Sequence, residues 1–201
     1  MIRSFTPQDI PTFPNIKILS YTKNKISKDY LLIERPPFIS AFINIDNQYG
    51  IFIEQYRPII DKITLEIPMG KIEKFDLSIE SALIRELQEE CNFFLGEDSS
   101  FLLVKNINTQ AIEKLIFTNC IITAETPNYL SPGFSTSQQY PFMISLSSSS
   151  KNISYIFDDY ILFSQETDLK VHLKKLNQEL FHQLDGLSRY YLISFLYQQS
   201  L

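Results

Sequence analysis

The sequence contains few of the residues from which several kinds of site are built. Glycine occurs five times in 201 residues, and cysteine and histidine occur twice each. Two cysteines and two histidines cannot form a Cys/His zinc cage or a disulfide framework, so any metal ion would be held by oxygen ligands. Because glycine most readily lets the backbone approach a ligand, the five glycines mark positions of interest: Gly50, Gly70, Gly96, Gly133 and Gly186.

Long apolar runs and an excess of positive charge are also missing. No stretch approaches the roughly 18 apolar residues that would cross a bilayer, and residues 1–14 lack the apolar core of a signal peptide. A formal net charge of −5 argues against a broad nucleic-acid-binding surface. We therefore expect a cytoplasmic protein that binds neither membranes nor nucleic acids.

Alternating apolar residues predict a protein rich in β-strands. Hydrophobic residues make up 44% of the chain and charged residues 20%, which is typical of a globular protein. Strands are predicted over residues 15–22, 29–35, 38–45, 50–56, 63–68, 101–105, 115–125 and 141–146. A hairpin turn is expected between residues 46 and 50.

Helical periodicity occurs in the middle of the chain and at its end. The segment from Ser78 to Cys91 is predicted to be a helix, because Ser78 is a candidate N-cap and no glycine or proline follows within it. After about residue 165 two further helices are predicted. The first would carry Leu169, Leu173, Leu176 and Leu180, and the second residues 187–196, with a break at Asp185 and Gly186. Strands around a central helix, with helices at the end, indicate an α+β fold or a three-layer α/β sandwich.

Three glutamates on the central helix form the pattern with the clearest chemistry. Glu86, Glu89 and Glu90 stand at i, i+3 and i+4, so their carboxylates project from one face of the helix. Like charges on one face repel one another, whereas hard divalent cations such as Mg²⁺ take carboxylate oxygens as ligands. The face is therefore either a metal site or an ordinary solvated acidic surface.

The residues around these glutamates have a recognisable order. Gly70 follows a strand, and the helix contains the run R-E-L-Q-E-E at residues 85–90. This order resembles the signature of the Nudix hydrolases, G-x5-E-x7-R-E-U-x-E-E-x-G-U, in which U is aliphatic. The segments EQYRP (54–58), LEIPMG (65–70) and SPGFS (131–135) are similar to segments of the ADP-ribose or ADP-sugar pyrophosphatase branch of that family.

The resemblance implies a fold, an activity and partners. The fold would be a Nudix-type α/β/α sandwich with a mixed β-sheet over residues 46–201, preceded by a small antiparallel β subdomain over residues 1–45 that serves dimerisation. The activity would be metal-dependent hydrolysis of the diphosphate bond of ADP-ribose or a related nucleoside diphosphate sugar, giving AMP or another nucleoside monophosphate and a sugar phosphate. Mg²⁺ would be the cofactor, with Mn²⁺ as a substitute, and the protein would be a homodimer.

Roles for individual residues follow from the same resemblance. Glu86, Glu89 and Glu90 would be metal ligands together with the backbone carbonyl of Met69, and Arg85 would pair with a neighbouring carboxylate to hold the loop against the helix. Arg57 would bind the diphosphate or the terminal ribose, and Gly133 would let its loop approach the ligand. The candidate stacking residues are Phe38, Tyr129 and Phe134.

The sequence departs from the family pattern at several positions. Asp76 stands where the signature has glutamate, and the interval from Gly70 to Arg85 is one residue longer than the consensus. Asn92 replaces the closing glycine, and asparagine is the next best residue for a left-handed helix C-cap.

The catalytic base is a further departure. Some members of the branch place a glutamate just after the P-G-F-S loop, whereas residues 136–139 read TSQQ. The candidate bases are Glu125, Asp158, Asp159 and Glu166. Two alternatives stay open, namely a catalytically weakened module that binds a nucleotide sugar and a Nudix enzyme for another nucleoside diphosphate derivative.

Overall fold

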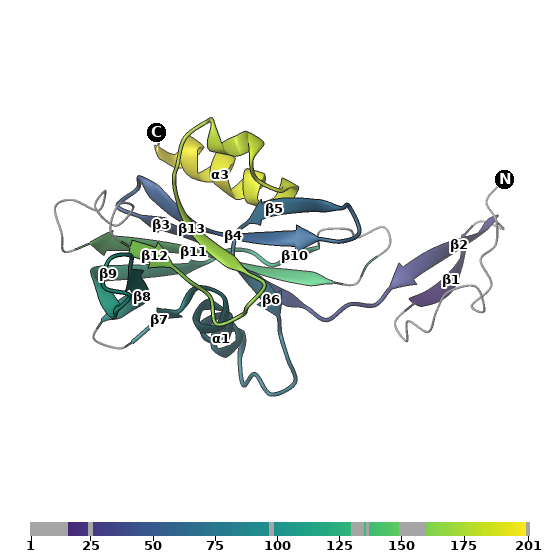
Figure 1. Cartoon of the computed structure of the whole chain (residues 1–201). Helices are drawn as coiled ribbons and strands as arrows, with labels where there is room; N and C mark the ends of the chain where they lie inside the picture. Colours follow the sequence, from purple (N-terminus) through teal and green to yellow (C-terminus); the bar gives the residue numbers. More distant parts are fainter. Residues whose placement is uncertain are drawn as a thin grey trace.

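The structure is a computed structural model that describes residues 16–23, 26–96, 99–129, 135, 137–148 and 160–199. The described strands form two sheets (Figure 1). Strands β1 (Ile16–Lys23) and β2 (Ile26–Ile33) form a two-stranded antiparallel sheet. All the other strands belong to one large mixed sheet.

The large sheet has the order β12-β8-β9-β11-β3-β4-β13, and four short strands pair at its sides. Strands β11 and β3 run parallel, whereas the other strand pairs are antiparallel. Its members are β3 (Phe38–Ile45), β4 (Tyr49–Arg57), β5 (Lys62–Glu66), β6 (Met69–Lys71), β7 (Phe93–Phe94), β8 (Ser100–Asn106), β9 (Ile112–Ala124), β10 (Asn128–Tyr129), β11 (Gln138–Ser148), β12 (Tyr160–Leu162) and β13 (Lys170–Lys175).

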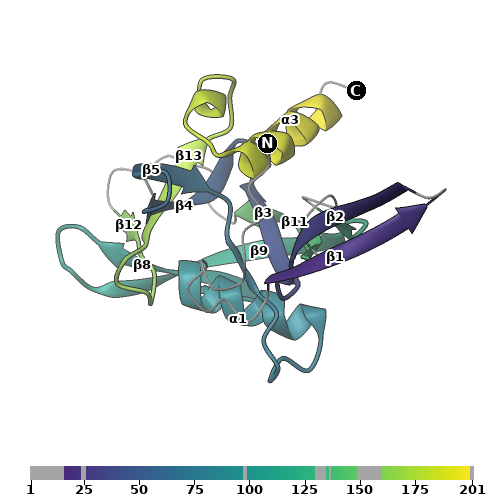
Figure 2. The ribbon, with the colours of Figure 1, turned by 90° about the vertical axis from the view of Figure 1, so that its right-hand side faces the viewer.

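Two α-helices cover opposite faces of this sheet (Figures 1 and 2). Side chains of β3 alternate between the two faces, as the pleat of a strand requires. Ile39, Ala41 and Ile43 pack in a core with buried residues of α1 (Ile79–Cys91), whereas Phe42 packs in a second core with α3 (Gly186–Gln199). The predicted α+β class is therefore confirmed. Among the described residues, no helix has the length and hydropathy that a membrane span requires.

Helix α1 begins and ends as the sequence predicts. Ser78 is the N-cap: its hydroxyl accepts a hydrogen bond from the Ser81 N–H at 3.1 Å, and the Ser81 hydroxyl accepts one from the Ser78 N–H at 2.9 Å. At the other end Asn92 adopts a left-handed conformation with φ 51° and ψ 37°. Asparagine therefore takes the C-cap position that the family pattern gives to glycine.

The Ser78 cap gives a first prediction. We expect Ser78→Ala to lower the free energy of unfolding by about 1 kcal/mol, because an N–H at the start of α1 loses its acceptor. Urea unfolding followed by circular dichroism measures this loss. Ser78→Asp keeps a side-chain acceptor and should remain close to wild type; an equal loss in both variants would contradict the capping role.

The prediction of a helix carrying Leu169, Leu173, Leu176 and Leu180 is wrong. Residues 170–175 form strand β13, which pairs antiparallel with β4 and places Val171 opposite Ile53. Leu169 and Val171 pack in the same core as α1, so this segment is held by the sheet. Between β13 and α3 the chain forms a 3₁₀ turn, Leu180–His182. The second predicted helix is confirmed by α3.

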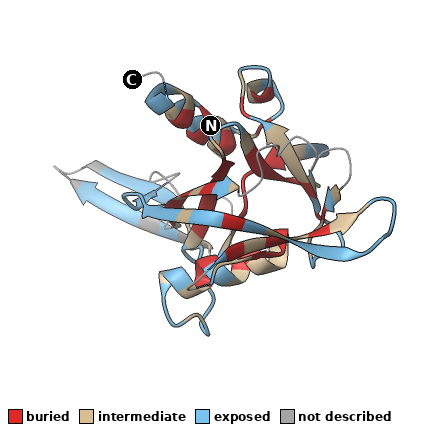
Figure 3. Ribbon diagram, turned by 90° about the vertical axis from the view of Figure 1, so that its left-hand side faces the viewer, coloured by how far each residue is buried: buried red, intermediate tan, exposed pale blue. Residues whose placement is uncertain are grey.

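The predicted domain boundary at residue 45 does not coincide with the division between the sheets. Strand β3, which that boundary assigns to the N-terminal subdomain, lies inside the large sheet between β11 and β4. Its side chains are buried almost throughout, because both faces of β3 are covered. The separate two-stranded sheet ends at Ile33, and its described residues are mostly exposed (Figure 3).

Candidate active site

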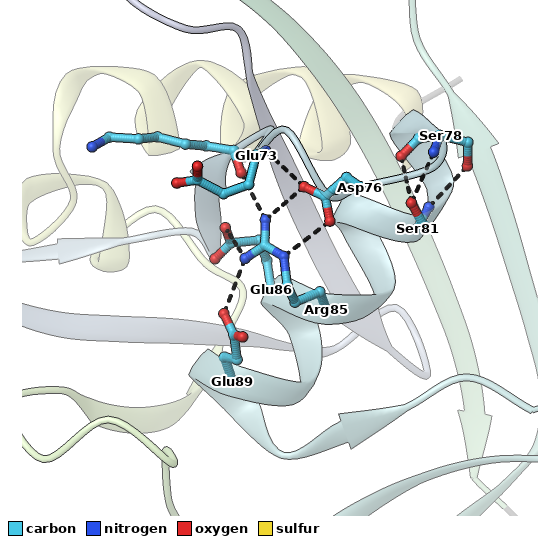
Figure 4. Close-up of polar contacts among 8 residues, drawn as sticks. Glu73, Asp76, Ser78, Ser81, Arg85, Glu86 and Glu89 are labelled. Atoms are coloured by element: carbon cyan, nitrogen blue, oxygen red, sulfur yellow. Dashed lines mark hydrogen bonds and ion pairs between the residues drawn. The ribbon is translucent and has the colours of Figure 1, made fainter.

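Arg85 on α1 is the centre of the site (Figure 4). Its Nε and Nη2 donate to the two carboxylate oxygens of Asp76 at 3.0 and 2.9 Å, and Nη2 also donates to the Lys71 carbonyl at 2.8 Å. Its Nη1 donates to Glu86 Oε1 at 2.7 Å and to Glu89 Oε2 at 3.0 Å. A guanidinium has five N–H groups, and these five contacts use them to tie the loop after β6 to the helix.

Gly70 makes room for the carboxylate of Glu86. A Cβ atom at this position would lie 1.8 Å from Cδ of Glu86 and 2.0 Å from each of its carboxylate oxygens. Glycine is required at position 70 for space and not for a left-handed backbone conformation. No described glycine has a positive φ, and the left-handed positions are occupied by other residues such as Asp46 and Asn92. Glu86 is only 7% exposed, so its carboxylate is enclosed between Gly70 and Arg85.

This close approach predicts the effect of Gly70→Ala. The new methyl group must displace the Glu86 carboxylate, so we expect a loss of about 1–3 kcal/mol in the free energy of unfolding, the usual cost of overpacking. Chemical denaturation measures the loss. Gly186→Ala is the matched control, because a Cβ there meets nothing within 4 Å, and an equal loss in the two variants would contradict the steric argument.

Glu90 lies beside Glu86 and is linked to the strand before the loop. Its Oε2 accepts a hydrogen bond from the Met69 N–H at 2.9 Å. Burial, together with repulsion from Glu86, raises the pKa of Glu90 well above its ordinary value. Burial also raises the pKa of Glu86, although Arg85 opposes that shift. A poorly solvated carboxylate with a second carboxylate beside it is a favourable environment for a cation.

A C-terminal segment docks on the end of α1 and brings another carboxylate near this pair. The Ser164 hydroxyl and the Gln165 N–H both donate to the Glu89 carbonyl at 2.9 Å. The next residue, Glu166, is close enough for its charge to raise the pKa of both Glu86 and Glu90.

The structure separates the candidate bases that it describes. Glu125 acts electrostatically on Tyr191 of α3, on the other face of the sheet, whereas Glu166 acts on the glutamate pair. Asp158 and Asp159 lie outside the described residues. Glu166 is therefore the described candidate that approaches the glutamates of α1.

Arg57 lies at the end of β4, where it is held by a carboxylate that the sequence did not single out. Its Nε donates to Glu66 Oε1 at 2.8 Å, and its Nη2 forms an ion pair with Glu66 Oε2. Thr64 donates to the same carboxylate. Burial acts to raise the pKa of Glu66, but these hydrogen bonds outweigh it and the pKa is lowered. The LEIPMG segment was the available signal for Glu66, because it contains this residue.

The remaining predicted residues differ in what the structure shows of them. Gly133 and Phe134 lie outside the described residues. Tyr129 is exposed on β10, and Phe38 is partly buried at the start of β3. Met69 contacts Glu90 through its N–H, whereas the predicted ligand is its carbonyl.

The three predicted metal ligands do not form a closed coordination group in this structure. Arg85 binds both Glu86 and Glu89, while Glu90 is bound to the backbone. Within the described part of the chain, no three His, Cys, Asp or Glu side chains form a group that could hold a metal ion. The chemistry of the donors nevertheless fits a hard divalent cation, since all three are carboxylates and two of them are poorly solvated.

Comparison with known proteins adds no assignment. No family model matches the sequence, and no curated protein matches it either. The functional inference is therefore carried by the residues of the site and their geometry.

Proposed function

We propose that the protein hydrolyses the diphosphate bond of ADP-ribose or a related nucleoside diphosphate sugar, giving a nucleoside monophosphate and a sugar phosphate. The observation that supports this most is the connection made by Arg85, which joins Asp76 in the loop to Glu86 and Glu89 on the helix. That connection gives Arg85, the arginine of the R-E-U-x-E-E run, a structural role. The three glutamates of the same run lie together at one end of α1. Membership of the Nudix hydrolases is part of the proposal.

The proposed cofactor is Mg²⁺, for which Mn²⁺ can substitute. Glu86, Glu89 and Glu90 would hold the ion, with the carbonyl of Met69 as a further ligand. When bound, such an ion polarises phosphate oxygens and lowers the pKa of a bound water. The raised pKa values of Glu86 and Glu90 support the proposal, because a cation would relieve the cost of burying two negative charges.

Other residues would bind the substrate and accept its proton. Arg57 is suited to a diphosphate, because a guanidinium binds phosphate oxygens through paired N–H groups. Its side chain is 43% exposed and therefore accessible. Glu166 would accept the proton of the attacking water on a carboxylate oxygen, since it lies near the glutamates and is itself exposed.

The test is hydrolysis by the full chain of a panel of nucleoside diphosphate sugars, headed by ADP-ribose, in the presence of Mg²⁺. We expect AMP and ribose phosphate in equal amounts from ADP-ribose. The rest of the panel separates ADP-ribose from another nucleoside diphosphate derivative as the preferred substrate. Absence of product from every member with both Mg²⁺ and Mn²⁺ would overturn the enzymatic proposal.

A second candidate function is a module that binds a nucleotide sugar without hydrolysing it. It is favoured by the contacts of Arg85, which engages two of the three proposed ligands, and by the absence of a glutamate in residues 136–139. Titration calorimetry with ADP-ribose separates the two functions. Binding without release of AMP over hours would favour the module, whereas turnover would exclude it.

The proposal includes a homodimer formed through the two-stranded sheet. A two-stranded sheet is marginally stable alone in water, and β1 and β2 expose Ile18, Tyr21, Tyr30 and Leu31. We therefore expect light scattering at micromolar concentration to give twice the chain mass of 23.5 kDa. A monomeric mass with full activity would contradict the dimer. Tyr30→Ser combined with Leu31→Ser is expected to favour the monomer, because both side chains are exposed.

A further inference from the structure

Strand β13 pairs on one side and is free on the other. It stands at the end of the strand order of the large sheet, beside β4, and no other described strand pairs with it. The Leu176 N–H donates to the Gln48 carbonyl at 2.8 Å, and this pair continues the antiparallel register of β13 with β4. Residues that exchange hydrogen bonds with the partner strand alternate with residues whose backbone groups point away from it. The N–H and C=O groups of Val171, Leu173 and Lys175 therefore point away from β4.

The free side of β13 borders a cavity. Strands β12 and β13 stand at the two ends of the strand order, and Cα atoms of the two strands come within 8 Å of each other (Figure 1). No pairing joins the two strands over their described residues, so the sheet curls without closing. Residues of both strands line a cavity of about 460 Å³, a size within the range of ligand-binding pockets. Its lining is largely apolar, and Leu162, Leu169 and Val171 of this lining also belong to the core that contains α1.

The same strand is strongly basic. Its residues, KVHLKK, include three lysines and a histidine but no acidic residue. Side chains alternate along a strand, so Lys170, His172 and Lys174 lie on one face and the apolar residues between them on the other. Glu54 on β4 accepts a hydrogen bond from Lys170 Nζ at 2.9 Å and lies 3.1 Å from His172 Nε2, so it offsets part of this charge. Within the described part of the chain, no ion pair joins Lys174 or Lys175 to an acidic residue.

This charge selects among the partners that a free strand edge can take. An edge strand offers unpaired backbone groups to any extended chain, and lysines on it discourage pairing with other copies of the same strand. Two copies of β13 would bring lysines close to one another, and like charges on neighbouring strands are destabilising. An acidic strand would instead place its carboxylates beside Lys170 and Lys174, and opposite charges on neighbouring strands attract each other.

We propose that the free side of β13 binds an extended, acidic segment of a partner protein, which adds to the large sheet as a further antiparallel strand. The backbone groups of Val171, Leu173 and Lys175 hold the segment through hydrogen bonds, the interaction on which strand addition in general depends. Its acidic side chains lie on the face of Lys170 and Lys174. Its alternate side chains are apolar and enter the cavity between β12 and β13.

The test uses a blocked peptide of the length of β13 in which glutamate and valine alternate, added to the full chain in titration calorimetry. We expect this peptide to bind to wild type, whereas the same peptide with lysine in place of glutamate should not. Lys174→Glu should weaken binding of the acidic peptide about fivefold, because an attractive pair of charges becomes repulsive, and should improve binding of the basic peptide. Lys28→Glu is the matched control. It changes the net charge equally, but Lys28 lies exposed on β2, so this variant should bind the acidic peptide as wild type does.

Pairing through the backbone is tested without any change to the protein. N-methylation of the valines keeps the charge of the peptide but removes the N–H groups that face Val171, Leu173 and Lys175, so this peptide should not bind. N-methylation of the glutamates removes N–H groups on the other side of the peptide and is the matched control. In amide hydrogen exchange followed by NMR, the unmodified peptide should slow exchange at those three residues. It should leave His172 and Lys174 unchanged, because their N–H groups already face β4.

Binding of the acidic peptide that depends on Lys174 and on the valine N–H groups, with slowed exchange on β13, supports strand addition. No binding of the acidic peptide, undiminished binding after N-methylation of the valines, or unchanged exchange overturns it. Equal weakening by Lys174→Glu and Lys28→Glu also overturns it, because the attraction then depends only on net charge. If Lys174→Glu does not fold, the N-methylated peptides and the exchange on wild type decide the question in the same way.

The free chain supplies a further check. Slow exchange at Val171, Leu173 and Lys175 before any peptide is added would show that another segment of this chain or a second copy already covers β13. Either case overturns the proposal, and the mass from light scattering separates the two.

Discussion

Replacing Arg85 with methionine is expected to lower the free energy of unfolding by about 3 kcal/mol, because the buried carboxylate of Glu86 loses its cationic partner. The Arg85 side chain is 19% exposed, and its guanidinium forms ion pairs with the carboxylates of Asp76, Glu86 and Glu89 at the same time. Methionine can fill the space of the aliphatic stem but offers no hydrogen bonds. The variant leaves the poorly solvated Glu86 next to two other unpaired carboxylates, and urea unfolding at pH 7 measures the result.

The pH dependence identifies the cause of that loss. Hydrogen bonds from Arg85 lower the pKa of Asp76 in the folded protein. The pair therefore stabilises the protein fully at pH values above the pKa of Asp76 in the unfolded chain, about 3.9. This stabilisation is lost as the pH falls through the lower pKa that Asp76 has in the folded protein. The difference in stability between wild type and Arg85→Met should therefore narrow in acid. Arg189→Met is the control, because Arg189 donates to the Leu184 carbonyl and its loss should be smaller and nearly independent of pH.

Local signals made part of the fold predictable. The N-cap Ser78, the left-handed Asn92 and the apolar stripe between them depend on residues close in sequence, and α1 was predicted with its correct ends. Strand β13 was predicted to be helical because Leu169, Leu173, Leu176 and Leu180 recur at intervals of four, three and four residues. Pairing with β4 decides its conformation, and a partner more than a hundred residues away leaves no trace in local periodicity.

The site was predictable to a similar extent. The order of residues in the R-E-L-Q-E-E run placed Arg85 and the three glutamates on one helix. Asp76 has a shorter side chain than the glutamate of the signature, but it lies on a longer loop and reaches Arg85. Glu66 was missed as a site residue because its burial arises from the pairing of β4 with β5 and its position relative to Arg57. Glu166 could be named as a candidate base, but its approach to Glu90 depends on the docking of Ser164 and Gln165 onto α1.

The largest expected effect on activity is that of Glu90→Gln, which should lower kcat/KM for ADP-ribose with Mg²⁺ by about 10³-fold, a loss of roughly 4 kcal/mol in transition-state stabilisation. The substitution preserves the shape of the side chain and can keep an acceptor for the Met69 N–H. It removes the charge on which cation binding would depend. Release of AMP, measured over a range of Mg²⁺ concentrations, gives both the rate and the apparent metal affinity.

Stability separates a catalytic role for Glu90 from a structural one. Burial and repulsion from Glu86 raise the pKa of Glu90, so the ionised form opposes folding at neutral pH and the uncharged glutamine should leave stability equal to or above that of wild type. Glu80→Gln is the matched control, because Glu80 lies exposed in the first turn of the same helix and should keep full activity. Wild-type turnover by Glu90→Gln would remove Glu90 from the proposed ligands, whereas loss of turnover in a stable protein places its charge in the reaction.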